Sequence, residues 1–66
     1  MPIIQVQMLS GRTLEQKERL INEVSECVAR ILEVSPERVR VVITEIPPEH
    51  WGIAGQSVAR QEREKQ

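Results

Sequence analysis

The chain is too short to bury a sizeable core on its own. Its 66 residues can remove only about 60% of the unfolded chain's surface from water, which leaves a lone monomer marginally stable. Domains of this size usually need a disulfide framework, a structural metal or oligomerisation. Cys27 is the only cysteine, so no internal disulfide can form, and one histidine beside one cysteine offers no ligand-spaced zinc cluster. Oligomerisation remains, so the sequence predicts a multimer.

Charge and composition narrow the class of partner. Nine Lys and Arg residues against ten Asp and Glu residues give a net charge of −1, which is not the basic footprint of a nucleic-acid-binding protein. Trp51 is the only aromatic residue, so no platform for stacking bases is present. No apolar run approaches the roughly 18 residues of a membrane helix, and no secretory signal is recognisable. We therefore expect a protein that binds neither nucleic acid nor membrane, with no cofactor or metal indicated. The single unpaired cysteine fits a reducing compartment, so we expect the cytoplasm.

The first half of the chain predicts a strand followed by a helix. Residues 3–9 alternate at period two, with Ile4, Val6 and Met8 on one face. After the break at residues 10–11, Thr13-Leu-Glu-Gln16 matches a capping box. From about residue 14 to 32, apolar residues recur at spacings of three and four, which predicts one long amphipathic helix. These apolar residues are Leu20, Ile21, Val24, Cys27, Val28, Ile31 and Leu32.

The second half predicts another strand and a short hairpin. Ser35-Pro36 ends the helix and can begin a single turn over residues 35–38. Residues 39–46 are so rich in β-branched residues that we expect a strand covered on both faces, as in a parallel sheet. Residues 50–55 contain two glycines and are interpreted as a turn or short hairpin. The charged tail beyond residue 57 is either a solvated helical end or a disordered terminus.

The predicted fold class is α/β (α+β), built from one β-α-β unit in a single domain over residues 1–66. Residues 1–57 are expected to form the ordered core, and residues 58–66 the charged tail. Two strands and one helix leave exposed sheet edges and an uncovered face, which favour pairing with another copy. The sequence thus predicts a dimer with a four-stranded sheet and two helices, able to assemble further.

Three residues are candidates for chemistry. Pro2 is a small residue that follows the initiator Met1, and cells commonly remove an initiator Met in this position. Pro2 would then begin the chain and carry a secondary amine. An α-amino group titrates near pH 8, and burial or a nearby cation lowers that value, which suits a general base. Arg12 precedes the helix, where a cation opposes the macrodipole unless it helps to hold an anion. Arg40 is a charge within an apolar strand and could stabilise an oxyanion.

Each candidate also has a purely structural interpretation. Pro2 can simply open an edge strand, where its missing N–H costs nothing. Arg12 can be a solvated loop residue, and Arg40 can extend along the strand end to water. Trp51 can line a pocket and exclude water from it, or it can anchor an interface between subunits. On this reasoning Cys27 is a packing residue, Glu45 a solvated charge, and His50 receives no role.

Taken together, these features resemble the 4-oxalocrotonate tautomerase family, the short-chain group of the tautomerase superfamily. The matching features run from Pro2 to about Gly55 and so cover nearly the whole chain. They are Met1-Pro2-Ile3, Gly11-Arg12-Thr13 followed by Glu15-Gln16-Lys17, the strand Val39-Arg40-Val41-Val42-Ile43-Thr44-Glu45, and His50-Trp51-Gly52-Ile53. Spacing, order and chain length all agree with that family.

The resemblance implies a homohexamer, formed as a trimer of dimers, with active sites between subunits. It implies that Pro2, freed of Met1, is the general base that moves a proton in a 2-hydroxy-dienoate such as 2-hydroxymuconate. By position, Arg12 would hold the distal carboxylate of this small carboxylate substrate. Arg40 would bind the other carboxylate and the 2-oxygen. Leu9 stands where the family uses a backbone amide near the substrate, and Trp51 stands where the best-known members have a phenylalanine wall.

Two further hypotheses remain open at this stage. The same fold could use a charged Pro2 as an acid for hydration, dehalogenation or decarboxylation of unsaturated acids. It could also be a non-catalytic oligomeric module in which Pro2 and both arginines are structural. In the hairpin, Ala54 stands where the family often has a glycine.

Overall fold

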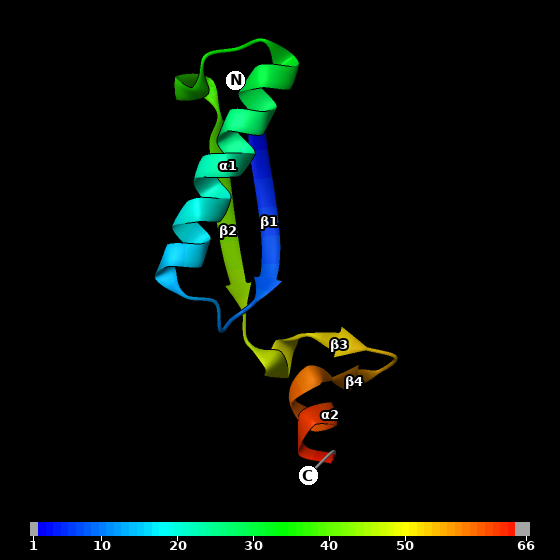
Figure 1. Ribbon diagram of the computed structural model, residues 1–66. Coiled ribbons are helices and arrows are strands. Elements are labelled where there is room, and N and C mark those ends of the chain that lie inside the picture. Colours follow the sequence, from blue (N-terminus) through cyan, green and yellow to red (C-terminus); the bar gives the residue numbers. More distant parts are fainter. Residues whose placement is uncertain (1, 65–66) are drawn as a thin grey trace.

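A computed structural model describes residues 2–64, and its central element is a β-α-β unit. Strand β1 (Ile3–Leu9) and strand β2 (Arg40–Ile46) pair in parallel, with Ile3 opposite Arg40 and Leu9 opposite Ile46. Helix α1 (Leu14–Leu32) connects them and lies across one face of the pair (Figure 1). The predicted strand, helix and parallel pairing are therefore confirmed, with β2 beginning one residue later than expected.

The predicted capping box forms at the start of α1. Gln16 donates its backbone N–H to Thr13 Oγ1 at 3.1 Å, and the Gln16 side-chain oxygen accepts from the backbone N–H of Thr13 at 3.1 Å. Two backbone donors that a helix start leaves unpaired are thereby satisfied. At the same end of the helix, Lys17 reaches Glu45 of β2 at 2.9 Å. Glu45, expected to be a solvated charge, is instead part of an ion pair that ties α1 to the sheet.

The elements after α1 are short. Ser35 caps a 3₁₀ helix over Pro36–Arg38, as its sequence predicted, and a second 3₁₀ helix covers Pro48–His50. Strands β3 (Gly52–Ile53) and β4 (Gln56–Ser57) form the expected antiparallel hairpin. Helix α2 (Val58–Glu64) follows directly, so this part of the tail is helical rather than irregular. The hairpin and α2 lie beyond the carboxyl ends of β1 and β2 (Figure 1).

A single chain buries very little. Ala29 and Val39, at 6% and 7% exposed, are the only buried hydrophobic residues of the described part. The described chain measures 47 × 24 × 14 Å, and its radius of gyration of 15.6 Å exceeds the roughly 11 Å of a compact monomer of this length. No helix within residues 2–64 is long and apolar enough to cross a membrane.

The apolar faces predicted from the sequence are only partly covered within one chain. Leu20, Val24 and Val28 of α1 are at least half-buried, whereas Ile21, Ile31 and Leu32 are exposed. On the sheet, the face opposite α1 is also open, with Ile3 60% and Val42 49% exposed. The expectation that β2 is covered on both faces is therefore wrong for the isolated chain, because α1, the only long helix among residues 2–64, can cover only one face.

Candidate active site

One end of the parallel sheet brings Pro2 and Arg40 together. Because the strands run in the same direction and Ile3 is opposite Arg40, both strands begin at this end. The backbone N–H of Arg40 donates to the carbonyl oxygen of Pro2 at 3.0 Å, which fixes Pro2 beside the second strand. Pro2 is half-buried. Met1, on whose removal the basic character of Pro2 depends, lies outside the described residues.

The side chain of Arg40 is held by its own loop and leaves its charge uncompensated. Its Nη1 donates to the carbonyl oxygen of Glu37 at 2.6 Å and lies 3.5 Å from that of Val39. Within residues 2–64 no ion pair engages Arg40. A guanidinium with free N–H groups binds carboxylates and oxyanions well. Arg40 therefore has the charge and the exposure that an anion site requires.

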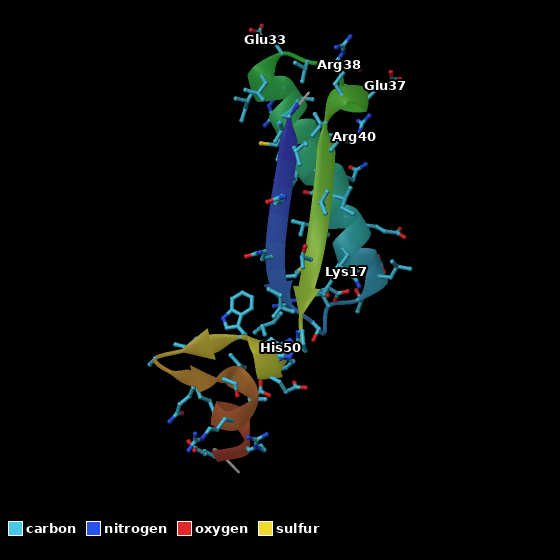
Figure 2. All side chains as sticks on the ribbon, turned by 180° about the vertical axis from the view of Figure 1, so that it is seen from behind. Lys17, Glu33, Glu37, Arg38, Arg40 and His50 are labelled. Carbon is cyan, nitrogen blue, oxygen red and sulfur yellow. The ribbon has the colours of Figure 1, made fainter. Side chains whose placement is uncertain are left out.

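The neighbourhood of Arg40 contains further charges that the sequence reasoning did not single out. Arg38, Glu33 and Glu37 lie at the same end of the molecule as Arg40 (Figure 2). Charges of both signs therefore meet at this end, so the Pro2 end is not a uniformly cationic surface.

Arg12 and Leu9 lie at the other end of the sheet. Arg12 is exposed between the left-handed Gly11 and the helix cap Thr13. Leu9 is half-buried at the last pair of β1 with β2. The seven residues of β1 separate this end from Pro2 by about 23 Å at about 3.3 Å per residue. One chain therefore does not bring Arg12 to Pro2.

Trp51 borders a hollow at this same distal end. The hollow has a volume of about 210 Å³ and is lined by Gln7, Ile46, His50, Trp51 and Gly52. Trp51 is half-buried and held between the second 3₁₀ helix and the hairpin, where its carbonyl oxygen accepts from the N–H of Val58 at 2.8 Å. Arg40 and His50 lie at opposite ends of the sheet (Figure 2).

The sequence reasoning missed two residues of this hollow, His50 and Gln7. His50 was given no role because no partner lies near it in the sequence, although its position beside Trp51 was a usable signal. Gln7 carried no signal, because the register of β1 against β2 is what brings it to the hollow. No group of three or more His, Cys, Asp or Glu residues within residues 2–64 is arranged to hold a metal ion.

The chain therefore carries two separate half-sites, which we define by their residues. The amine half-site consists of Pro2 and Arg40, and the wall half-site consists of Leu9, Arg12 and Trp51. The first holds the candidate base and a cation where the two paired strands begin, and the second holds a cation and an aromatic side chain at the opposite end of the sheet. Neither half-site has all the candidate groups, so a site that uses all five residues needs at least two chains.

Comparison with known proteins identifies the family. A family model described as "Tautomerase enzyme" matches residues 2–61. The chain belongs to the tautomerase family. It is similar to the 2-hydroxymuconate tautomerase of Pseudomonas fluorescens, with 52% identity over 63 residues that cover 96% of this chain and 100% of the relative. The predicted resemblance to 4-oxalocrotonate tautomerases is thus confirmed, and the chain is an isomerase.

Solved structures agree with the fold of this tautomerase. TomN, a 4-oxalocrotonate tautomerase homologue of the tomaymycin biosynthetic pathway, superimposes with a TM-score of 0.91 at 32% identity, covering 98% of this chain and 100% of TomN. A chain of a heterohexameric 4-oxalocrotonate tautomerase from Chloroflexus aurantiacus gives a TM-score of 0.85 at 39% identity, covering 89% of this chain and 95% of that one. The predicted β-α-β fold class is therefore confirmed for this tautomerase.

Proposed function

We propose that this tautomerase moves a proton within a small enol acid of the 2-hydroxymuconate type, with Pro2 as the general base. The adjacency of Pro2 and Arg40 at one open end of the sheet carries the proposal. After removal of Met1, Pro2 has a secondary amine instead of an amide nitrogen. An α-amino group titrates near pH 8, and a neighbouring cation disfavours its charged form. The amine is then available as a base near neutral pH.

The arginines are proposed to bind the two ends of an extended dicarboxylate. Arg40 binds one carboxylate and the 2-oxygen, where negative charge develops as the dienol loses its proton. Arg12 binds the distal carboxylate and draws electron density toward the carbon that receives the proton. Trp51 excludes water from the reacting atoms, and the backbone amide of Leu9 lies near the substrate. The support for these roles is the exposure of both guanidinium groups and the position of Trp51 beside a hollow.

We further propose that the complete site forms between chains of an oligomer, as a homohexamer of one-domain subunits spanning residues 1–66. The support is threefold: the half-sites lie at opposite ends of β1, the chain is extended, and apolar residues on both α1 and the sheet are exposed. A relative of known structure is a heterohexamer.

The test is ketonisation of 2-hydroxymuconate, followed by ultraviolet absorbance on protein whose lack of Met1 is verified by mass spectrometry. We expect turnover that falls by about 10²- to 10⁴-fold when Met1 is retained, because this is the contribution of a positioned general base. Pro2→Ala, which keeps a primary amine, lowers turnover less. Pro36→Ala, at a proline outside both half-sites, is the matched control. Unchanged turnover with Met1 attached would falsify the role of Pro2.

A pH profile of the same reaction separates a base from an acid. If Pro2 acts as a base it must be neutral, so kcat/KM rises with pH through the pKa of the amine in the free enzyme. A charged Pro2 that acts as an acid gives the opposite limb, with kcat/KM falling as pH rises. The second outcome would favour hydration, dehalogenation or decarboxylation of an unsaturated acid instead.

A further inference from the structure

The hollow beside Trp51 has polar groups that the proposed mechanism leaves unused. Ile46 and Trp51 line it with apolar side chains, and Gly52 lines it without a side chain. His50 and Gln7 add hydrogen-bonding groups. Both polar side chains are exposed. No hydrogen bond shown among residues 2–64 involves the side chain of either residue. Within one chain, both side chains are therefore free to contact a ligand.

The size and chemistry of the hollow suit one end of a small acid. Its volume of about 210 Å³ is below the roughly 300 Å³ at which pockets for drug-sized ligands begin. An imidazole has an N–H donor in either neutral tautomer, and a primary amide has two. Donors directed at a carboxylate form the stronger class of hydrogen bond. A pocket that combines an aromatic wall with a few hydrogen-bond donors can recognise an organic anion.

From these observations we propose that His50 and Gln7 are specificity-determining residues that bind the distal carboxylate of a dicarboxylate substrate in addition to Arg12. This inference rests on the proposed function, because it assigns the hollow to the substrate end remote from Pro2. His50 comes from the 3₁₀ helix Pro48–His50 and Gln7 from β1, so the fold brings together two donors that lie 43 positions apart in the sequence. Each donates one hydrogen bond to the carboxylate, and Trp51 packs against the carbon chain.

Gly52 is a lining residue that can be enlarged without disturbing the fold. A Cβ added at Gly52 would meet only the backbone oxygen of Gln56, at 4.0 Å, which is ordinary contact. Its backbone also lies outside the left-handed region, unlike that of Gly11 and Gly55. Gly52→Ala therefore adds a methyl group to a lining residue at little conformational cost, and we expect weaker ligand binding if this methyl group enters the hollow.

The fluorescence of Trp51 allows binding to be measured independently of catalysis. Trp51 is the only tryptophan and the chain has no tyrosine, so its intrinsic fluorescence comes from Trp51 alone and reports on the side of the hollow that Trp51 lines. The probe is adipate, a saturated six-carbon dicarboxylate that cannot tautomerise, and hexanoate is the matched monocarboxylate. We expect adipate to change the emission of Trp51 and hexanoate to bind more weakly.

The variants test each donor against a matched neighbour. His50→Leu and Gln7→Leu each raise the Kd of adipate by about tenfold, the usual effect of losing a hydrogen bond to a charged group, and hexanoate binding changes little. His50→Gln, which keeps a donor, restores most of the affinity. Gln5→Leu and Glu49→Gln leave both constants unchanged, because Gln5 shares the exposed face of β1 and Glu49 shares the 3₁₀ helix, yet neither lines the hollow.

Two outcomes would overturn the inference. One is the absence of any adipate effect on Trp51 in the unaltered protein, and the other is equal adipate affinity in His50→Leu, Gln7→Leu and their controls. Assembly of every variant is checked by sedimentation, so that a loss of binding is not a loss of the oligomer. Failure of the proposed function is seen separately, as turnover that does not respond to retention of Met1.

Discussion

The separation of Pro2 from Arg12 predicts that two impaired variants, each with lowered turnover, can restore one another. At about 3.3 Å per residue, the seven residues of β1 hold the two groups about 23 Å apart. Charge-assisted hydrogen bonds act at about 2.8 Å, so Arg12 of the same chain cannot reach a substrate held at Pro2. A chain with Pro2→Ala and a chain with Arg12→Ala each lack one group, yet each supplies the group that the other lacks. When equal amounts mix at random, about one quarter of the sites regain both groups.

The assay is 2-hydroxymuconate ketonisation after the two variants are unfolded together and refolded, with mixing verified by native mass spectrometry. We expect about one quarter of the activity of the unaltered protein per site, well above either variant alone. The control mixes unaltered chains with the double variant Pro2→Ala/Arg12→Ala. If each site takes Pro2 and Arg12 from different chains, this control keeps about one quarter of the activity. If both residues come from one chain, it keeps about one half. Two results together would refute the reasoning. The mixture of the two single variants would show no recovery of activity, and the mixture with the double variant would keep one half of the activity.

The remaining predictions concern stability, measured by chemical denaturation at one fixed chain concentration because assembly contributes to it. Thr13→Ala removes the acceptor 3.1 Å from the Gln16 N–H and lowers the free energy of unfolding by about 1 kcal/mol; an unchanged midpoint would show that the capping box contributes nothing. Ala54→Gly relieves a φ of 54° and raises this free energy by about 1 kcal/mol, so a loss of stability would contradict the strain. Glu45→Gln breaks the partly exposed 2.9 Å pair with Lys17 and costs about 0.5 kcal/mol, a cost that shrinks at high salt; a salt-independent effect would point to packing.

Local chemistry made several elements predictable. The Thr13–Gln16 capping box fixed the start of α1, and the apolar spacing carried the helix to Leu32, where the structure also ends it. Ser35-Pro36 predicted a turn that forms as a 3₁₀ helix, and the glycines around Ile53 predicted the hairpin. Each of these signals acts over a few residues, through a backbone hydrogen bond or an allowed φ, so sequence alone is enough to recognise it.

Contacts between distant segments were much less predictable. The ion pair of Lys17 with Glu45 joins residues 28 positions apart, and Glu45 alone resembles a solvated charge. Ile21, Ile31 and Leu32 share the apolar stripe of α1 yet stay exposed in one chain. Periodicity identifies an apolar face of a helix, but it does not say how much of that face its own sheet can cover.

The sequence by itself determined the order strand, helix, strand and hairpin, the identity of the candidate base and arginines, and the need for more than one chain. The order of elements follows from period and caps, and the need for more than one chain follows from length. The candidate base and arginines follow from their positions in the sequence and from the resemblance to the family. Only the tertiary structure decided which candidates meet. The parallel register brings Arg40 to Pro2, separates Arg12 from both, and puts Gln7 at the hollow of His50 and Trp51. The register depends on pairing between residues more than 35 positions apart. Such pairs form only in the folded chain, so patterns within short segments do not reveal them.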